Sequence, residues 1–588
     1  MTTNFHRRRS TFGSSLLDFA QDAGTETFMA SPWARLASLA TRVELGGGEW
    51  LFRAGEPADS VYVVLWGRLE AVVEQPDPAT VAILGRGEAV GELALITGTP
   101  RSLSVRARRD SSLLRISRAD FDRVLAEDPE YAVALMRGMA KRLRDVTAAQ
   151  TLPIDPIPRT IAVVPICPGP DIAGFARALS TSLARLASVA ELTGMPADNV
   201  SAGILDRAER DHEHVLLIAS QPPGDDAWTS FAIRSADRVL AVVDCTTPPQ
   251  QIQRNVEMFK GCDLVMLNAR ASAWADLLAP RAIHNLPDGP TPPAIGRLAR
   301  RLAGRSLGLV LSGGGARAFS HLGVLDELDA AGVKIDRIAG ASMGAFIAAV
   351  YAQGRSADEV AEVVREEFVR RKLLRDYTLP IAALLRHRRA FAMAQRVFGD
   401  ALIEELPLDY FCVSCDLLTA ELVAHRRGLV WLASGASMNL PAIYPPLPLD
   451  GRLLVDGGVL NNLPADVMAA VGEGPVIAAD ATSNADLQAG RRRSGGPAWM
   501  GRASHRARDI IVGTLGPVPS FKETLIRSIV LGSANTAINA QQHADVVITP
   551  DIGAIALTDW ARIDEMREAG RAAARAAIEA APELVGDA

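Results

Sequence analysis

Hydrophobic and polar positions over the first part of the chain follow the pattern of short β-strands. The run Ser60–Trp66 is almost wholly apolar and meets a glycine, and the run Leu69–Val73 follows it after a single turn. Short apolar runs broken by glycine turns over 31–118 predict a small β-barrel or β-roll. Over 119–149 the apolar residues recur at helical spacing instead, so we expect helical structure to follow the strands.

Beyond residue 158 the pattern changes to apolar strands that alternate with helices. Four buried strands are expected in the middle of the chain, at Ile161–Ile166, Val215–Ala219, Val239–Val243 and Leu264–Leu267. This alternation is typical of an α/β layer domain with a parallel, Rossmann-like sheet. A second region of alternating strands and helices begins near Ser306 and runs to the end of the chain.

These patterns predict a multidomain α/β protein, because 588 residues exceed what one hydrophobic core supports. We expect a flexible arm over 1–30, a β-roll domain over 31–150, an α/β spacer domain over 159–285 and an α/β/α domain over 306–588. Proline-rich stretches around 151–160 and 287–293 are expected to be linkers.

Composition narrows the class of protein. Hydrophobic residues make up 48% of the chain and charged residues 22%, which is usual for a globular protein. The net charge of −6 provides no overall positive field, so we expect no nucleic-acid partner. Cys412 and Cys415 have a CxxC spacing but lie in a run typical of a buried strand, so no metal site is expected.

The same sequence features suggest a location. Five cysteines are sparse and odd in number, which favours a reducing compartment. We find no signal peptide and no run of the roughly 18 apolar residues that a spanning helix needs. The protein is therefore expected to be cytoplasmic, or peripheral to the inner face of the membrane.

Two glycine-rich turns lie one βαβ unit apart in the last region. The first contains Gly313, Gly314 and Gly315, followed by Ala316 and Arg317. Consecutive glycines expose backbone N–H groups, which can receive a developing oxyanion.

The second turn predicts a nucleophile. It reads Gly340-Ala341-Ser342-Met343-Gly344, after an expected strand and before an expected helix. This is a G-x-S-x-G elbow in the strand–turn–helix context that lifts a serine above a sheet. Ser342 is therefore the predicted nucleophile of an acyl hydrolase.

A serine nucleophile needs a base, and the sequence offers two kinds. Asp456 ends a short expected strand before Gly457 and Gly458, a position from which it can reach a neighbouring elbow. Alternatively, His505 or His543 would complete an α/β-hydrolase triad in the order Ser, Asp, His. His321, on the helix after the glycine loop, is expected to be a packed histidine rather than a proton carrier.

On these residues the last region resembles the patatin-like phospholipases of the neuropathy target esterase family. The resemblance covers about 306–580, and it rests on Ser312–Arg317, Gly340–Gly344, Asp456–Gly458 and Ala436–Pro446. It implies a cofactor-free Ser–Asp dyad acting on phospholipid or lysophospholipid acyl esters. Ser342 would attack the ester carbonyl and Asp456 would take its proton, while the N–H groups of Gly313, Gly314 and Gly315 hold the oxyanion.

A second motif lies within the predicted β-roll. Taken alone, the run Gly91–Ser102 is a turn with a short helix and an arginine, both of which can meet a phosphate. The region 31–145 resembles a cyclic-nucleotide-binding domain, with its cassette matched at Gly91, Glu92, Leu93, Ala94, Pro100 and Arg101. The resemblance implies that Glu92 contacts the ribose and Arg101 the cyclic phosphate of a regulatory ligand. Ser102 leaves the choice between cAMP and cGMP open, and cAMP is favoured.

Two alternatives stay open at this point. Ala318 stands where the esterase family usually has glycine, so a non-enzymatic cyclic-nucleotide sensor with a degenerate hydrolase domain is the rival function. The basic, partly amphipathic stretch 369–398 is either a solvated helical cap or a peripheral contact with anionic lipid.

Overall fold

The computed structural model describes residues 39–582, apart from 74–78, 86, 128–156, 195–198, 225, 247–255, 269–271, 372–384, 483–540, 554, 556 and 558. The chain divides into two compact units, Met1–Val265 with Leu278–Ala282 and Met266–Leu277 with Ile283–Ala588. The predicted arm over 1–30, most of the first proline-rich linker and the end of the helical stretch 119–149 lie outside the described residues.

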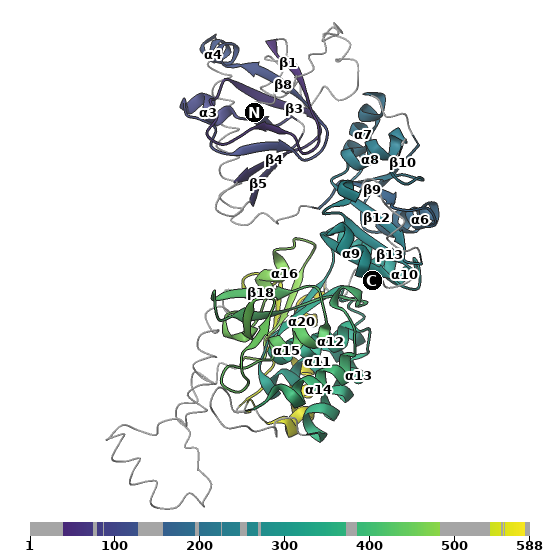
Figure 1. Cartoon of the computed structure of the whole chain (residues 1–588), viewed down its shortest axis with the longest axis vertical. Helices are drawn as coiled ribbons and strands as arrows, with labels where there is room; N and C mark the ends of the chain where they lie inside the picture. The colour runs from purple at the N-terminus through teal and green to yellow at the C-terminus, as the bar shows by residue number, and fades with distance from the viewer. Residues whose placement is uncertain are drawn as a thin grey trace, which may run out of the picture. The chain divides into compact units, whose positions relative to one another are not determined.

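The predicted β-roll is present at the start of the first unit (Figure 1). Its strands form two four-stranded antiparallel sheets, in the orders β1-β8-β3-β6 and β2-β7-β4-β5. Their bounds are β1 Thr41–Leu45, β2 Trp50–Phe52, β3 Ser60–Trp66, β4 Leu69–Val73, β5 Ala79–Leu84, β6 Ala89–Val90, β7 Ser104–Ala107 and β8 Ser111–Ser117. Two helices accompany them, α3 Glu92–Thr97 and α4 Arg118–Glu127.

Strand β3 is apolar from Val61 onward because both of its faces are buried. Val61 and Val63 face one buried cluster, whereas Tyr62 and Val64 face another. A strand covered on both faces has no polar side, so the run does not alternate.

The α/β domain has a six-stranded sheet in the order β10-β11-β9-β12-β13-β14. The bounds are β9 Thr160–Pro165, β10 Val189–Thr193, β11 His214–Ile218, β12 Arg238–Asp244, β13 Asp263–Leu267 and β14 Ala282–Leu286, with helices α6 Ile172–Leu183, α7 Asn199–Asp211, α8 Ala227–Ser235 and α9 Ser272–Leu278. The four expected strands are β9, β11, β12 and β13. The sequence missed β10 and β14 because edge strands are half exposed and carry polar residues.

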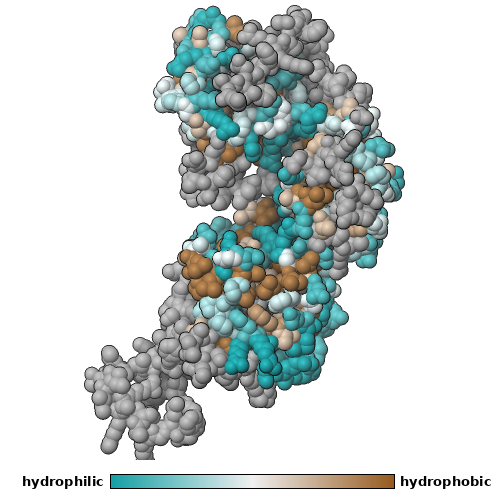
Figure 2. Space-filling model, viewed as in Figure 1, coloured by the Kyte–Doolittle hydropathy of each residue, from teal (hydrophilic) through white to brown (hydrophobic). Residues whose placement is uncertain are grey.

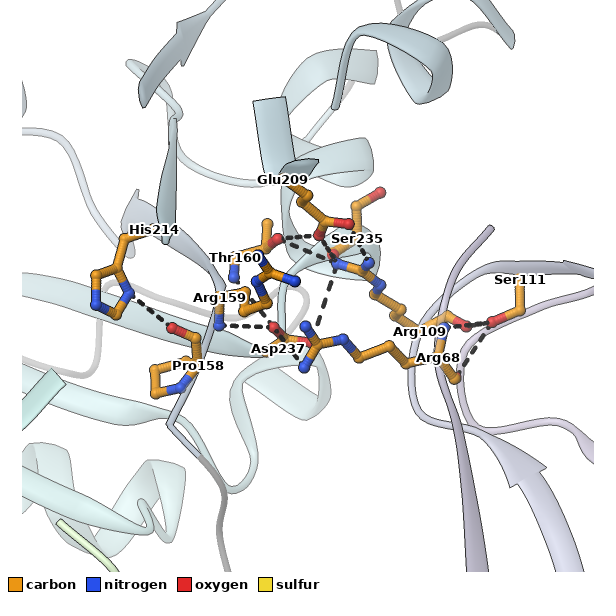
Figure 3. Close-up of polar contacts among 10 residues, drawn as sticks. All are labelled: Arg68, Arg109, Ser111, Pro158, Arg159, Thr160, Glu209, His214, Ser235 and Asp237. Carbon is orange, nitrogen blue, oxygen red and sulfur yellow. Dashed lines mark hydrogen bonds and ion pairs between the residues drawn. The ribbon is translucent and has the colours of Figure 1, made fainter. Parts of the chain in front are cut away.

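Within the first unit, the roll meets the α/β domain through a buried charge cluster, which we call the junction cluster (Figure 3). Arg109 in the β7–β8 turn donates to both carboxylate oxygens of Glu209, at 2.5 and 2.8 Å, and to the carbonyl oxygen of Ser235 at 2.9 Å. Arg68 in the β3–β4 turn pairs with Asp237 at 3.2 Å. Burial alone would raise the pKa of Asp237, but Arg109 and Arg68 hold it below its usual value.

The second unit is built on a mixed sheet in the order β19-β20-β17-β16-β15-β21-β22, and β18 also pairs with β17. Strands are β15 Gly308–Leu311, β16 Arg337–Ala341, β17 Asp409–Asp416, β18 Glu421–His425, β19 Leu447–Leu449, β20 Arg452–Asp456, β21 Val476–Ala479 and β22 Val546–Ile548. Helices are α10 Pro292–Leu302, α11 Ser320–Ala330, α12 Ser342–Ala352, α13 Ala357–Val364, α14 His387–Phe398, α15 Val430–Ser437, α16 Ala465–Ala469 and α20 Ile563–Ala580. The predicted fold class is thereby confirmed.

The segment 287–293 is not the irregular linker that its prolines suggested. Pro292 and Pro293 form the first turn of α10, after Thr291 at the N-cap. Proline is tolerated there because the first helical N–H groups have no intrahelical partner.

Helices α11 and α20 cross closely, although they are far apart in sequence. A Cβ on Gly570 would lie 1.8 Å from the carbonyl oxygen of Ser320, and one on Gly323 would lie 1.8 Å from that of Arg567. Asp326 of α11 also accepts from Arg567 and Arg571 at 2.5 and 2.9 Å. The C-terminal helix is therefore bound to the helix that follows the glycine loop.

Candidate active site

Strand pairing brings the two predicted catalytic side chains together. Parallel β16 pairs with the first part of β17 and ends with Ala341 opposite Val413. Antiparallel β20 pairs with the last part of β17 and ends with Asp456 opposite Ser414. The ends of β16 and β20 thus meet beside adjacent residues of β17. There the hydroxyl of Ser342 donates to the Oδ2 of Asp456 at 2.6 Å.

The environment of Asp456 makes it a weaker acid than usual. Its side chain is buried, and this desolvation raises its pKa to about 7, although hydrogen bonds from Ser342 and the Gly458 N–H oppose the rise. The Gly458 N–H donates to Oδ1 at 2.8 Å, so one backbone group fixes the orientation of the carboxylate. A carboxylate with this pKa can accept a proton near neutral pH.

The backbone around Ser342 has the strained form of a nucleophile elbow. Its φ is +52°, a left-handed value that is uncommon for a residue with a side chain. Gly344 permits the tight turn, because a Cβ there would lie 2.3 Å from the carbonyl oxygen of Leu311. The N–H of Ser342 donates to the hydroxyl of Ser437 at 3.0 Å, which ties the elbow to α15.

The glycine loop lies against the elbow, and its three N–H groups differ in availability. The Gly313 N–H already donates to the carbonyl oxygen of Asn462 at 3.2 Å. Within the part of the chain that is described, the N–H groups of Gly314 and Gly315 have no acceptor. Arg317, from the same motif, donates through Nε to the carbonyl oxygen of Ile555 at 2.7 Å.

His321 supports the loop from behind. Its Nε2 lies 2.9 Å from the carbonyl oxygen of Ser312, so Nε2 must carry the proton, because a carbonyl only accepts. Burial lowers its pKa to about 4, and the histidine is therefore neutral. It is packed, as predicted, and does not contact Ser342.

Of the two histidines predicted for a triad, only His543 is among the described residues, and it does not meet the dyad. His505 lies outside the described residues. His543 is exposed, and no hydrogen bond between described residues links it to Ser342 or Asp456. Sequence reasoning instead missed His425, whose Nε2 lies 2.6 Å from the Oγ of Ser414, the residue opposite Asp456.

Sequence reasoning also missed Asn439, which supports the strand that carries Asp456. Its carbonyl oxygen accepts from the Asp456 N–H at 2.9 Å, and its side chain donates to the carbonyl oxygens of Leu454 and Pro445. It falls in the stretch 436–446 that carried the resemblance, which was the available signal.

The predicted nucleotide cassette lies in the first unit. Gly91 has φ of 86° and precedes α3, where Glu92 and Ala94 are buried and Leu93 is exposed. Arg101 is buried over the Phe52 ring and donates to the carbonyl oxygens of Gly91 and Ser60, at 2.9 and 2.6 Å. Its Nε has no partner among the described residues, and the neighbouring Ser102 is exposed.

Comparison with known families agrees with both motifs. The model of the patatin-like phospholipase family matches residues 309–469, and that of the cyclic nucleotide-binding domain matches residues 42–128.

None of the helices in the described part of the chain combines the length and the apolar composition that a membrane-spanning segment needs.

Relatives extend the match to most of the chain. Human patatin-like phospholipase domain-containing protein 6 is 29% identical over 538 residues, which cover 78% of this chain and 39% of that protein. Lysophospholipase NTE1 of Yarrowia lipolytica is 27% identical over 651 residues, 90% of this chain and 45% of the relative. An NTE family protein of Mycobacterium tuberculosis is 37% identical over 579 residues, which cover 94% of both chains. The chain therefore belongs to the NTE family, and it joins a patatin-like phospholipase domain to a cyclic nucleotide-binding domain.

Proposed function

We propose that the protein is a serine acyl hydrolase that cleaves phospholipid or lysophospholipid acyl esters through Ser342 and Asp456. The observation that carries the proposal is the 2.6 Å hydrogen bond from the Ser342 hydroxyl to Asp456. The patatin-like family match and the lysophospholipase among the relatives support the substrate class.

The proposed mechanism uses this geometry and involves no cofactor. Asp456 takes the hydroxyl proton as the Ser342 oxygen bonds to the ester carbonyl carbon, and the N–H groups of Gly314 and Gly315 receive the oxyanion. Collapse of this tetrahedral intermediate breaks the ester bond, and the leaving alcohol takes the proton from Asp456. Water then attacks the acyl-serine with Asp456 again as base, which releases the fatty acid and restores the serine.

Covalent labelling with a fluorophosphonate probe tests the nucleophile. We expect the wild-type chain to be labelled and Ser342→Ala to remain unlabelled, because the probe phosphonylates only an activated serine oxygen. Ser434→Ala is the matched control and should leave labelling detectable. It removes a hydroxyl from α15 whose contact, the carbonyl oxygen of Trp431, lies within that helix. Equally poor labelling of wild type and Ser342→Ala would favour the rival function, a nucleotide sensor with a degenerate hydrolase domain.

A cyclic nucleotide is the proposed ligand of the β-roll, with Glu92 on the ribose and Arg101 on the phosphate. The domain match and the buried Arg101 with its free Nε support this assignment. cAMP is favoured over cGMP, and the ligand is proposed to regulate the hydrolase.

Contact with the cytoplasmic face of a membrane is also proposed, but for only part of the stretch 369–398. Arg370 and Arg371 pair with Glu362 and Glu366, so their charge is already compensated. Residues 372–384 lie outside the described part. The start of α14 keeps an exposed basic group, Arg386 at the N-cap with Arg388 and Arg389 in the first turn.

A further inference from the structure

Two adjacent leucines protrude from the second unit at the tip of the β17–β18 hairpin. Leu417 and Leu418 are 50% and 67% exposed, the largest fractions of any large apolar side chain among the described residues. In Figure 2, apolar residues (brown) gather on the part of this unit where Figure 1 labels β18. Exposing two neighbouring leucines has a cost in water, so an apolar partner is expected for this tip.

Hydrogen bonds order the tip. The carboxylate oxygen Oδ1 of Asp416 accepts from the N–H groups of Leu418 and Leu453, at 3.0 and 3.1 Å. The Leu417 N–H donates to the Leu453 carbonyl oxygen at 2.9 Å, and Ala420 takes a φ of +58° to close the turn. The leucines are therefore presented to solvent by an ordered turn.

The tip projects from the edge of the sheet that carries the dyad. β17 runs parallel to β15 and β16 along the sheet, so their C-terminal ends share the edge at which the Gly313 loop and Ser342 lie. Ser414 lies opposite Asp456, and β17 continues from it to Asp416. Two residues of strand advance about 7 Å, so the leucines lie just beyond the dyad along the strand.

Positive charge lies near β20, the strand that pairs with the end of β17. His387, in the first turn of α14, bonds to Asn439, whose amide donates to the carbonyl oxygen of Leu454. Leu454 follows Leu453, the residue that holds the tip. The exposed Arg386, Arg388 and Arg389 flank His387, and no described residue forms an ion pair with them.

We propose that the Leu417–Leu418 tip inserts into a phospholipid surface and, with the three arginines on lipid phosphates, docks the catalytic edge on the bilayer. The inference rests on the proposed function, since a lipid-ester hydrolase must meet its substrate at such a surface. An apolar wedge beside a basic group matches the order of a bilayer, in which acyl chains lie beneath phosphates. Glu421 is exposed beside the tip, and its negative charge does not attract lipid phosphates. The leucines are therefore the main source of binding to neutral lipid.

The test compares the full chain with a Leu417→Ser/Leu418→Ser variant. Binding to phosphatidylcholine vesicles is measured by flotation, together with hydrolysis of phosphatidylcholine in those vesicles and of a water-soluble p-nitrophenyl ester. We expect vesicle binding and vesicle hydrolysis to fall about tenfold or more, because burial of even one leucine contributes enough for such a change. Soluble-ester hydrolysis should stay at the wild-type rate, which also shows that the variant is folded.

Two further variants sharpen the result. Ile204→Ser/Met258→Ser removes two exposed apolar side chains from the first unit and should bind vesicles as wild type does. Arg386→Glu/Arg388→Glu/Arg389→Glu should weaken binding far more when the vesicles contain phosphatidylglycerol, because the choline of phosphatidylcholine already neutralises its phosphate.

The possible outcomes separate this inference from the proposed function. Wild-type vesicle binding by the leucine variant, or no vesicle binding by the wild type, would overturn the docking surface even if the soluble ester is cleaved. Leucine-dependent binding without hydrolysis of either substrate would instead support the surface and count against the hydrolase.

Discussion

At the scale of single residues, the burial of Asp456 decides how the reaction depends on pH. As the proposed base, Asp456 must be ionised to take the Ser342 proton, and its pKa is raised to about 7. We expect kcat/KM for a neutral, water-soluble ester to rise with pH and to reach half its plateau near pH 7. An aspartate with the ordinary pKa of 3.8 would leave the rate flat over this range.

Asp456→Asn is the variant for that measurement. It keeps the volume but removes the base, so the rate should fall about 10²–10⁴-fold and lose its step near pH 7. The folded pKa lies above the unfolded value, so ionised Asp456 costs stability progressively as pH rises from about 4 to 7. The variant should therefore unfold at no lower temperature than wild type at pH 8. If His505→Ala or His543→Ala abolished turnover while Asp456→Asn spared it, a triad would replace the dyad.

At the scale of elements, the crossing of α11 and α20 holds the helix behind the glycine loop. Gly570→Val would push a side chain into the Ser320 carbonyl. Replacing glycine by a residue with better helix propensity stabilises a helix by at most about 1 kcal/mol, the difference between glycine and alanine. Overpacking, in contrast, typically costs about 1–3 kcal/mol. Because the added atom meets rigid backbone, we expect the clash to dominate and the chain to lose stability.

Thermal inactivation reports on that element, measured as the loss of fluorophosphonate labelling after heating the full chain. Gly570→Val should inactivate at a lower temperature than wild type. Ala572→Val adds similar bulk at an exposed position of the same helix and should leave the temperature nearly unchanged. Equal inactivation of the two variants would show that the close crossing is not needed.

Some secondary-structure elements could be predicted from the sequence and others could not. Local pattern sufficed for the buried strands β3, β9 and β12, and for the elbow, whose Gly-x-Ser-x-Gly spacing encodes a tight turn. It failed at β10 and β14, where edge exposure removes the apolar signal, and at Pro292, where a helix start has the composition of a linker. The supports of the site, such as Asn439, Asn462 and His425, act through contacts between distant strands, which periodicity does not encode.

At the scale of the whole molecule, the first question is whether the roll binds its proposed ligand. Arg101→Ala removes the donor for the cyclic phosphate, and a charge-assisted hydrogen bond contributes about 1.5–3 kcal/mol. We therefore expect affinity for cAMP to fall about ten- to a hundredfold, as measured by isothermal titration of the full chain. Arg53→Ala removes an arginine that lies over Trp50, outside the cassette, and should bind nearly as wild type does. A wild-type chain that binds neither cAMP nor cGMP would remove the ligand from the proposal.

The second question is how ligand binding reaches the rest of the chain, and the junction cluster offers a route. Strand β7 begins three residues after Arg101 and leads directly into the turn that carries Arg109. Arg109 forms a buried ion pair with Glu209 from that turn. A shift of β7 on ligand binding would therefore displace this pair. We expect Arg109→Met to bind cAMP with nearly wild-type affinity.

If the junction cluster carries the signal, the effect of saturating cAMP on ester hydrolysis should be lost in Arg109→Met. Typical coupling energies are about 1–3 kcal/mol, so the wild-type effect to be lost is roughly five- to 150-fold. Removing one partner of a buried ion pair also costs about 3–5 kcal/mol, because Glu209 is left without its main cation. Arg109→Met/Glu209→Leu removes both charges and should recover stability while the response to cAMP stays absent. Recovery of the response in the double variant would show that Arg109→Met acted through local unfolding, and that the ion pair itself does not transmit the signal.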